Sequence, residues 1–169
     1  LSCIMEIDEN GKVVNSEIAE TVINSKARMT YTEVSDILEK DDEKLKQTFA
    51  KQVEDFKNAE KLARILMKRR ERRGAIDFDF PEAKIILNRE GKVVDIKCYE
   101  RRISNKMIEE FMLVANETVA EHFYWLQLPF VYRIHETPSA EKMEDLNKFI
   151  ATFGYHIKGD LEDVHPKEI

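Results

Sequence analysis

The sequence predicts a mixed α/β fold (α+β), with an antiparallel-rich sheet, one long amphipathic helix and one central buried helix. Short alternating apolar segments separated by glycine-containing turns predict β-hairpins. Apolar residues at helical spacing over 41–73 predict the amphipathic helix. Residues 102–125 carry apolar side chains on two nearly opposite helical faces, which is typical of a helix covered on both sides. The 169 residues suffice for one domain with a hydrophobic core.

The N-terminal part predicts a β-hairpin followed by a short helix. Residues 1–7 alternate as a strand does, and the Asp-Glu-Asn-Gly sequence after them predicts a turn. The second strand is expected to continue as far as Ile23. Thr30 is a suitable N-cap for the short helix, which would bury Val34 and Ile37 on its inner face.

The segment 41–73 is predicted to be one continuous amphipathic helix that ends at Gly74, a residue typical of helix C-termini. Its last turns are strongly basic, with the sequence KRRERR at 68–73. Cations stabilise a helix C-terminus through the helix dipole, and this is the favoured explanation of the run. Phosphate binding is the alternative role.

Three strands are expected after this helix, at 75–80, 82–87 and 93–99. The Arg-Glu-Gly-Lys sequence between the last two predicts a hairpin turn. Beyond the central helix, a strand is expected at 129–135 and a helix at 139–153, ended by a glycine.

The central helix places two neighbouring glutamates on different faces. Glu109 and Asn116 share a face with apolar side chains, whereas Glu110 falls on a polar strip, where we expect it to be solvated and paired with Lys106. A carboxylate on an apolar face is costly unless it is hydrogen-bonded. Glu109 is therefore expected either to bond neighbouring backbone or to contact a ligand, and a ribose 2′-OH is a suitable donor.

Charge, hydropathy and motif content give no support for several classes of function. The chain has 27 basic and 33 acidic residues, a formal net charge of -6, so overall charge gives no argument for nucleic-acid binding, which would need a local site. Cys3 and Cys98 show no metal-ligand spacing, and a reducing, cytoplasmic setting is expected. No apolar run approaches the ~18 residues of a membrane span. The sequence contains no P-loop, no nucleophile elbow and no histidine spacing typical of zinc sites.

The sequence GAIDFDF alternates aromatic and acidic residues. At least one of Phe78 and Phe80 is expected to be a core residue, as is usual in such a strand. Asp77 and Asp79 would share the other face, where two carboxylates can hold a divalent metal, but no third ligand has recognisable spacing. Tyr31, at the start of the short helix, is either a core residue or a ligand-facing hydroxyl.

Several segments together resemble a known family. They are LSCIMEID, VINSKARMTYTEVSDIL, RRGAIDFDFPEAKIIL, RRISNKMIEEFMLVANETVAEHF, and PFVYRIHETP with FGYHIKG. In this order and spacing they resemble the RNB catalytic domain of the bacterial RNase II/RNase R family, most closely its RNase R branch, over essentially the whole chain. That family consists of processive 3′→5′ exoribonucleases that release nucleoside 5′-monophosphates from single-stranded RNA.

The resemblance implies roles for three residues that would bind the 3′ end of single-stranded RNA. Tyr31 matches the tyrosine that helps to set RNA preference. Phe78 matches the phenylalanine that clamps the stacked terminal nucleotides, with Phe80 as the alternative because the alignment needs a small gap there. Glu109 matches the acidic residue that contacts a ribose hydroxyl, in agreement with its separation from Glu110 on the helix.

The resemblance also places essential parts of the family's machinery elsewhere. The four aspartates that hold Mg²⁺ are expected before residue 1, and the catalytic arginine and flanking RNA-binding modules also lie outside 1–169. The chain is therefore expected to be a partial RNB catalytic domain, an internal fragment with no catalytic residue and no bound metal, inactive by itself. The alternative is a non-enzymatic RNA-binding or scaffold domain. Exposed sheet edges would favour self-association.

Overall fold

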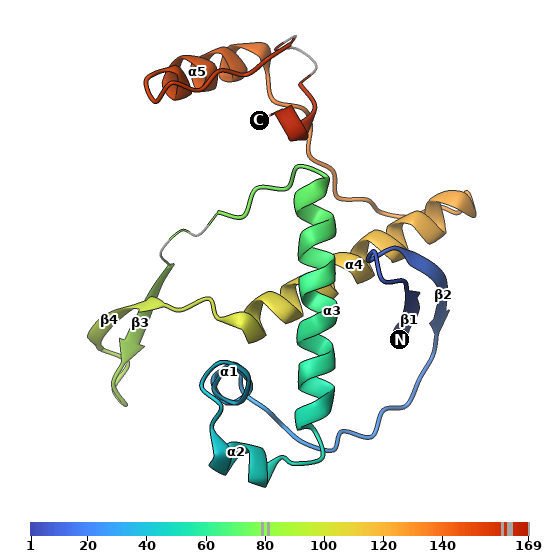
Figure 1. Cartoon of the computed structure of the whole chain (residues 1–169), viewed down its shortest axis with the longest axis vertical. Helices are drawn as coiled ribbons and strands as arrows, with labels where there is room; N and C mark the ends of the chain where they lie inside the picture. Colours follow the sequence, from blue (N-terminus) through green and yellow to red (C-terminus); the bar gives the residue numbers. More distant parts are fainter. Residues whose placement is uncertain (79, 81, 160, 162–163, 169) are drawn as a thin grey trace.

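Two long helices that cross each other form the centre of the fold (Figure 1). They are α3 (Val53–Arg72) and α4 (Ile103–Trp125), and they belong to a computed structural model that describes residues 1–78, 80, 82–159, 161 and 164–168. Their contact buries Ala63 of α3 against Ile103 and Met107 of α4. This small core joins the two helices, and both contribute residues to the candidate site.

The N-terminal hairpin pairs β1 (Ser2–Ile7) antiparallel to β2 (Val13–Ala19), as predicted. Gly11 has a φ of 82°, a left-handed conformation that glycine adopts without steric cost, and it closes the turn. β2 contacts α4. The second strand ends earlier than expected, because the segment that holds Ile23 is exposed and unpaired with β1.

The short helix α1 (Tyr31–Glu39) begins where the sequence predicts. The Thr30 side chain accepts a hydrogen bond from the Glu33 backbone N–H, and the Glu33 carboxylate accepts one from the Thr30 N–H, which completes a capping box. Val34 and Ile37 are buried, as expected. α1 is tied to α4 by a buried hydrogen bond of 2.7 Å between the hydroxyls of Ser35 and Ser104.

The prediction of one continuous helix over 41–73 is wrong, since the segment forms α2 (Glu43–Thr48) and α3. The Asp42 side chain caps α2 by accepting from the Leu45 N–H. The chain leaves helical geometry at Phe49, the C-cap of α2. Apolar spacing continues across this break, so periodicity alone does not reveal it. Gly74, with a φ of 93°, follows the end of α3 as predicted.

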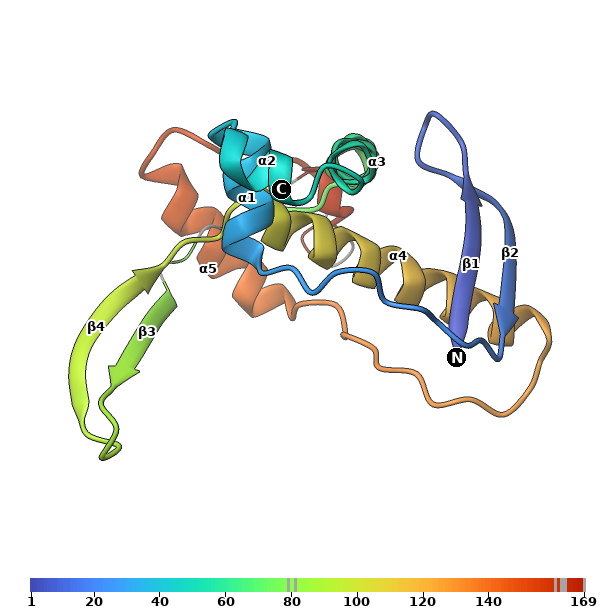
Figure 2. The same cartoon turned by 90° about the horizontal axis from the view of Figure 1, so that it is seen from below.

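A second hairpin, β3 (Glu82–Leu87) and β4 (Val93–Tyr99), is antiparallel and separate from the first. The antiparallel pairing is as expected, but the described chain holds two small sheets instead of one. The expected strand at 75–80 is wrong for its described residues, 75–78 and 80, which lie outside any strand. In both views the hairpin projects away from the crossing helices (Figure 2).

The central helix α4 is contacted by α1, α3 and β2, which confirms that it is an internal element. Complete covering of its two apolar faces is not observed, because Ile108 of one face and Met112 of the other are 42% and 61% exposed. The expected strand at 129–135 is also wrong, since this segment is irregular. The last α-helix of the described chain, α5 (Ala140–Ala151), begins at the N-cap Ser139 as predicted. None of the helices in the described ranges is long and apolar enough to cross a bilayer.

Candidate functional site

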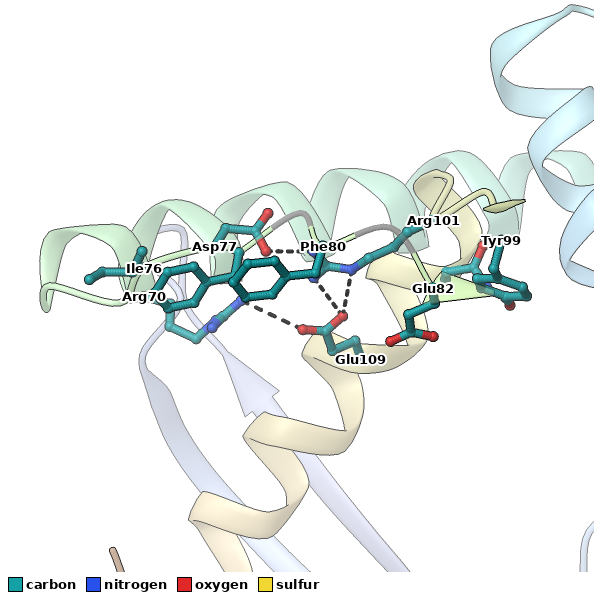
Figure 3. A pocket seen from close by; sticks show the side chains of 10 residues that line it. Arg70, Ile76, Asp77, Phe80, Glu82, Tyr99, Arg101 and Glu109 are labelled. Carbon is teal, nitrogen blue, oxygen red and sulfur yellow. Dashed lines mark hydrogen bonds and ion pairs between the residues drawn. The ribbon is translucent and has the colours of Figure 1, made fainter. Parts of the chain in front are cut away.

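A hollow of about 400 Å³ opens where the end of α3, residues 76–78 with 80 and 82, the end of β4 and the start of α4 meet (Figure 3). Its lining combines aromatic rings with charged groups. The aromatic residues are Phe78, Phe80 and Tyr99, and the charged residues are Arg70, Asp77, Glu82, Arg101 and Glu109.

Glu109 reaches this hollow from the second turn of α4, with its side chain 41% exposed. Its Oε2 atom accepts two hydrogen bonds from Arg101, from Nε at 3.1 Å and from Nη2 at 2.6 Å. Its Oε1 atom lies 3.9 Å from Arg70 Nη2, which is beyond hydrogen-bond distance. Arg101 thus holds one oxygen of the carboxylate by hydrogen bonds, whereas the other oxygen accepts no hydrogen bond from the described residues and lies within ion-pair distance of Arg70.

Glu110 is buried, which contradicts the prediction that it is solvated. Its side chain is 4% exposed and accepts from Arg70 Nε at 3.0 Å and Nη2 at 2.7 Å. The expected pair with Lys106 is not formed, because Lys106 instead lies 3.4 Å from Asp77. The physical reason is that α3 packs on the face of α4 that carries Glu110 and brings Arg70 to it. Asn116, expected on an apolar face, is exposed.

Phe78 and Phe80 stack on each other, with ring centroids 5.3 Å apart and planes 8° from parallel. They are 63% and 73% exposed, so the expectation that at least one is a core residue is wrong. A parallel aromatic pair of this kind presents a flat apolar face to the hollow, and such a face is suited to stacking on a nucleic-acid base.

Asp77 is paired with two cationic side chains, those of Arg101 and Lys106. Its Oδ1 accepts from Arg101 Nη1 at 2.5 Å, and this hydrogen bond, with help from Lys106, lowers the pKa of the carboxyl below its ordinary value. Asp79, its proposed partner, lies outside the described residues. Throughout the described ranges no group of three or more His, Cys, Asp or Glu side chains would hold a metal ion.

Tyr31 lies on an adjoining hollow of about 250 Å³ and is 48% exposed. This second hollow shares Glu109, Tyr99 and Asn105 with the first, and the Asn105 amide donates a 2.7 Å hydrogen bond to the Tyr99 hydroxyl. The structure thus places Tyr31 and Phe78 in two hollows that share Glu109. The role of each of these three residues stays a prediction.

The sequence reasoning missed Arg101, which bonds both Asp77 and Glu109. It precedes α4 and so has no place in a helical pattern. Two arginines of the basic run at 68–73 form ion pairs within the chain, Arg70 with Glu110 and Arg73 with Glu117. Phosphate binding therefore has no support for these two arginines.

Comparison with known proteins gives a consistent result. The RNB domain matches residues 1–169. The chain is 45% identical over 166 residues to Ribonuclease R 1 of Lactococcus lactis, covering 98% of this chain and 20% of the relative. It is 43% identical over 171 residues to Ribonuclease R of Thermotoga maritima, covering 98% and 23%. The chain thus spans less than a quarter of these two relatives.

The fold is also similar to solved structures. Mycoplasma genitalium RNase R in complex with ribose-methylated single-stranded RNA superposes with a TM-score of 0.86 at 24% identity, over 98% of this chain and 26% of that one. The same enzyme in complex with double-stranded RNA gives the same TM-score, with 29% of that chain covered.

Proposed function

This chain belongs to the RNB domain family, and from that membership we propose that it is part of the catalytic domain of a cytoplasmic 3′→5′ exoribonuclease. The enzyme would hydrolyse single-stranded RNA to nucleoside 5′-monophosphates, and this chain would line the path of the RNA 3′ end. The observation that carries the proposal is that the exposed aromatic pair Phe78–Phe80 and the Glu109 carboxylate, which has one oxygen without a hydrogen bond, line the same hollow.

The aromatic pair would bind a terminal base. The parallel rings of Phe78 and Phe80 leave an outer face free for stacking, a contact worth about 1–3 kcal/mol per base. Stacking depends little on base identity, because every base has an aromatic face. This suits an enzyme that degrades RNA of any sequence. We assign the clamp to Phe78 on the family resemblance.

Glu109 would distinguish RNA from DNA. Its Oε1 is the acceptor not used by Arg101, so it is available for the hydrogen of a ribose 2′-OH. Tyr31, across the adjoining hollow, would line the pocket of the terminal nucleotide. A deoxyribose in the same place would leave the Glu109 acceptor without its partner, at a cost in binding free energy.

The hydrolytic step itself is assigned to the longer enzyme. The family's Mg²⁺ would be held by the aspartates that the resemblance places outside these residues, and none of the residues that the structure describes is proposed to hold the ion. We therefore propose that residues 1–169 alone do not cleave RNA. Incubation of this polypeptide with Mg²⁺ and 5′-labelled single-stranded RNA should leave the RNA intact, and a ladder shortening from the 3′ end would contradict this.

We also propose that the isolated polypeptide self-associates. The β3–β4 hairpin exposes apolar side chains on a two-stranded sheet with open edges, among them Ile85, Val94 and Ile96 at 58%, 59% and 64% exposure. Light scattering that finds a monomer, together with a sharp calorimetric melting transition, would contradict this.

The decisive test of the RNA-binding role is Glu109→Ala in the longer enzyme. Cleavage rates on matched RNA and DNA oligonucleotides should differ less in the variant, with the RNA-to-DNA ratio falling by roughly tenfold, as expected for the loss of one hydrogen bond. Glu117→Ala is the matched control, because Glu117 is also an ion-paired glutamate of α4 but lies outside both hollows. An unchanged ratio in the Glu109 variant would refute the proposed contact.

A further inference from the structure

One guanidinium connects the two parts of the candidate site. Arg101 Nε and Nη2 donate to Glu109 Oε2, and Arg101 Nη1 donates to Asp77 Oδ1. Asp77 directly precedes Phe78 in the chain. Arg101 therefore joins the segment that carries the stacking ring to the helix that carries the carboxylate, as the dashed lines in Figure 3 show.

The geometry of this bridge determines which Glu109 oxygen is free. Both Arg101 hydrogen bonds to Glu109 end on Oε2. Oε1 accepts no hydrogen bond from the residues that the structure describes and lies 3.9 Å from Arg70 Nη2. A guanidinium is planar and rigid, so two bonds from one arginine restrict the rotation of the carboxylate far more than a single point contact would. An acceptor held in place before binding loses less conformational entropy when the ligand arrives.

We propose that Arg101 is a positioning residue for RNA recognition. It directs Glu109 Oε1 toward the ribose hydroxyl and, through Asp77, holds the Phe78 segment at a fixed distance from that acceptor. Ribose recognition and base stacking are then parts of one preorganised unit. This inference rests on the function proposed above for Glu109 and Phe78, and it adds a residue that acts through Glu109 and Asp77.

The neighbouring residue supplies a matched control. Arg102 also makes a multiple ion pair, with Asp36 Oδ1 at 2.7 Å and Glu39 Oε2 at 2.7 Å, and its side chain is 18% exposed against 22% for Arg101. These partners belong to α1, so Arg102 fastens α4 to α1 and does not line either hollow. The two arginines thus share chemistry and burial, and only Arg101 contacts the candidate site.

The test compares Arg101→Lys and Arg102→Lys in the longer enzyme. Lysine keeps the charge but offers a single point donor in place of the fork. Arg101→Lys should raise the KM for RNA several-fold with little change in kcat and raise the KM for DNA less. The ratio of RNA cleavage to DNA cleavage should fall toward that of Glu109→Ala. Arg102→Lys should lower the melting temperature and leave the ratio of RNA cleavage to DNA cleavage unchanged.

A second variant tests the link to the stacking segment. Asp77→Asn weakens the bond from Arg101 to that segment and leaves the Arg101–Glu109 contact in place. The length of the smallest end product should change, because the Phe78 side is released, whereas the RNA-to-DNA ratio should stay near that of the unmodified enzyme. An unchanged end product in Asp77→Asn would overturn the proposed bridge.

The outcomes separate the two proposals. If Glu109→Ala lowers the RNA-to-DNA ratio and Arg101→Lys does not, the positioning role is refuted and the ribose contact stands. If Arg101→Lys and Arg102→Lys reduce RNA and DNA cleavage equally, Arg101 serves only the fold and the inference is again refuted. If Glu109→Ala leaves the ratio unchanged, the proposed function of Glu109 fails first.

Discussion

Two ion pairs between the C-terminal end of α3, including its C-cap residue Arg73, and α4 differ in burial and so predict very different losses of stability. Arg70 donates to Glu110 at 3.0 and 2.7 Å, and Arg73 donates to Glu117 at 3.1 and 2.7 Å. The Glu110 side chain is 4% exposed, whereas that of Glu117 is 44% exposed. The pairs share helices and chemistry, so replacing each arginine isolates the effect of burial.

Arg70→Met should lower the free energy of unfolding by about 3 kcal/mol, because it leaves the Glu110 carboxylate buried without a partner. We expect the lower end of the usual range, since the Arg70 side chain is itself 23% exposed and water can enter the space it vacates. Arg73→Met should cost only about 0.2–1 kcal/mol, the usual value for an exposed pair. Combining Arg70→Met with Glu110→Leu should recover part of the loss, because no buried charge remains.

Urea unfolding followed by far-UV circular dichroism would measure these differences. A loss for Arg70→Met no larger than that for Arg73→Met would refute the argument from burial. A double variant as unstable as Arg70→Met alone would show that packing, and not the unpaired carboxylate, causes the loss. Either result would also contradict the explanation that Glu110 is buried because Arg70 of α3 pairs with it.

Three further predictions concern the site and its supports. In the longer enzyme, Phe78→Ala should change the length of the smallest end product and Phe80→Ala should not; the reverse result on a denaturing gel would assign the clamp to Phe80. Thr30→Ala removes the cap of α1 and should cost about 1 kcal/mol in urea unfolding, and an unaltered midpoint would contradict this. Because the hydrogen bond from Arg101 lowers the pKa of Asp77, the pair stabilises the fold above the ordinary carboxyl pKa of 3.8 and the contribution is lost as pH falls through the lowered value. The unmodified protein should therefore melt at a higher temperature than Asp77→Asn at neutral pH, and this difference should shrink in acid. A difference that stays constant with pH would contradict the predicted lowering of the Asp77 pKa.

Local chemistry by itself determined where several elements begin and turn. Thr30 and Ser139 cap helices in the structure as their residue types predict, since a cap needs only its own side chain and the next few backbone N–H groups. The Gly11 and Gly91 turns likewise follow from the left-handed conformation that glycine allows. Membership of the RNB family was also readable in the sequence, because its segments occur in order along the whole chain.

Strand pairing was decided by tertiary structure. Residues 129–135 resemble a strand in sequence but stay irregular, because a strand needs hydrogen bonds from a neighbour and no alternation pattern reveals whether one is present. The described residues of 75–80 behave in the same way, and there the irregular backbone turns Phe78 and Phe80 outward onto the hollow.

The two glutamates of α4 show the same limit within a single helix. The helical period separated Glu109 from Glu110, because neighbouring positions lie about 100° apart around the axis. It did not show which of the two faces would be covered. That depended on α3, whose Arg70 comes from 40 residues earlier in the chain and buries Glu110, while Arg101 holds Glu109 at the edge of the hollow. Periodicity is a property of one helix, whereas burial is a property of the helices packed against it.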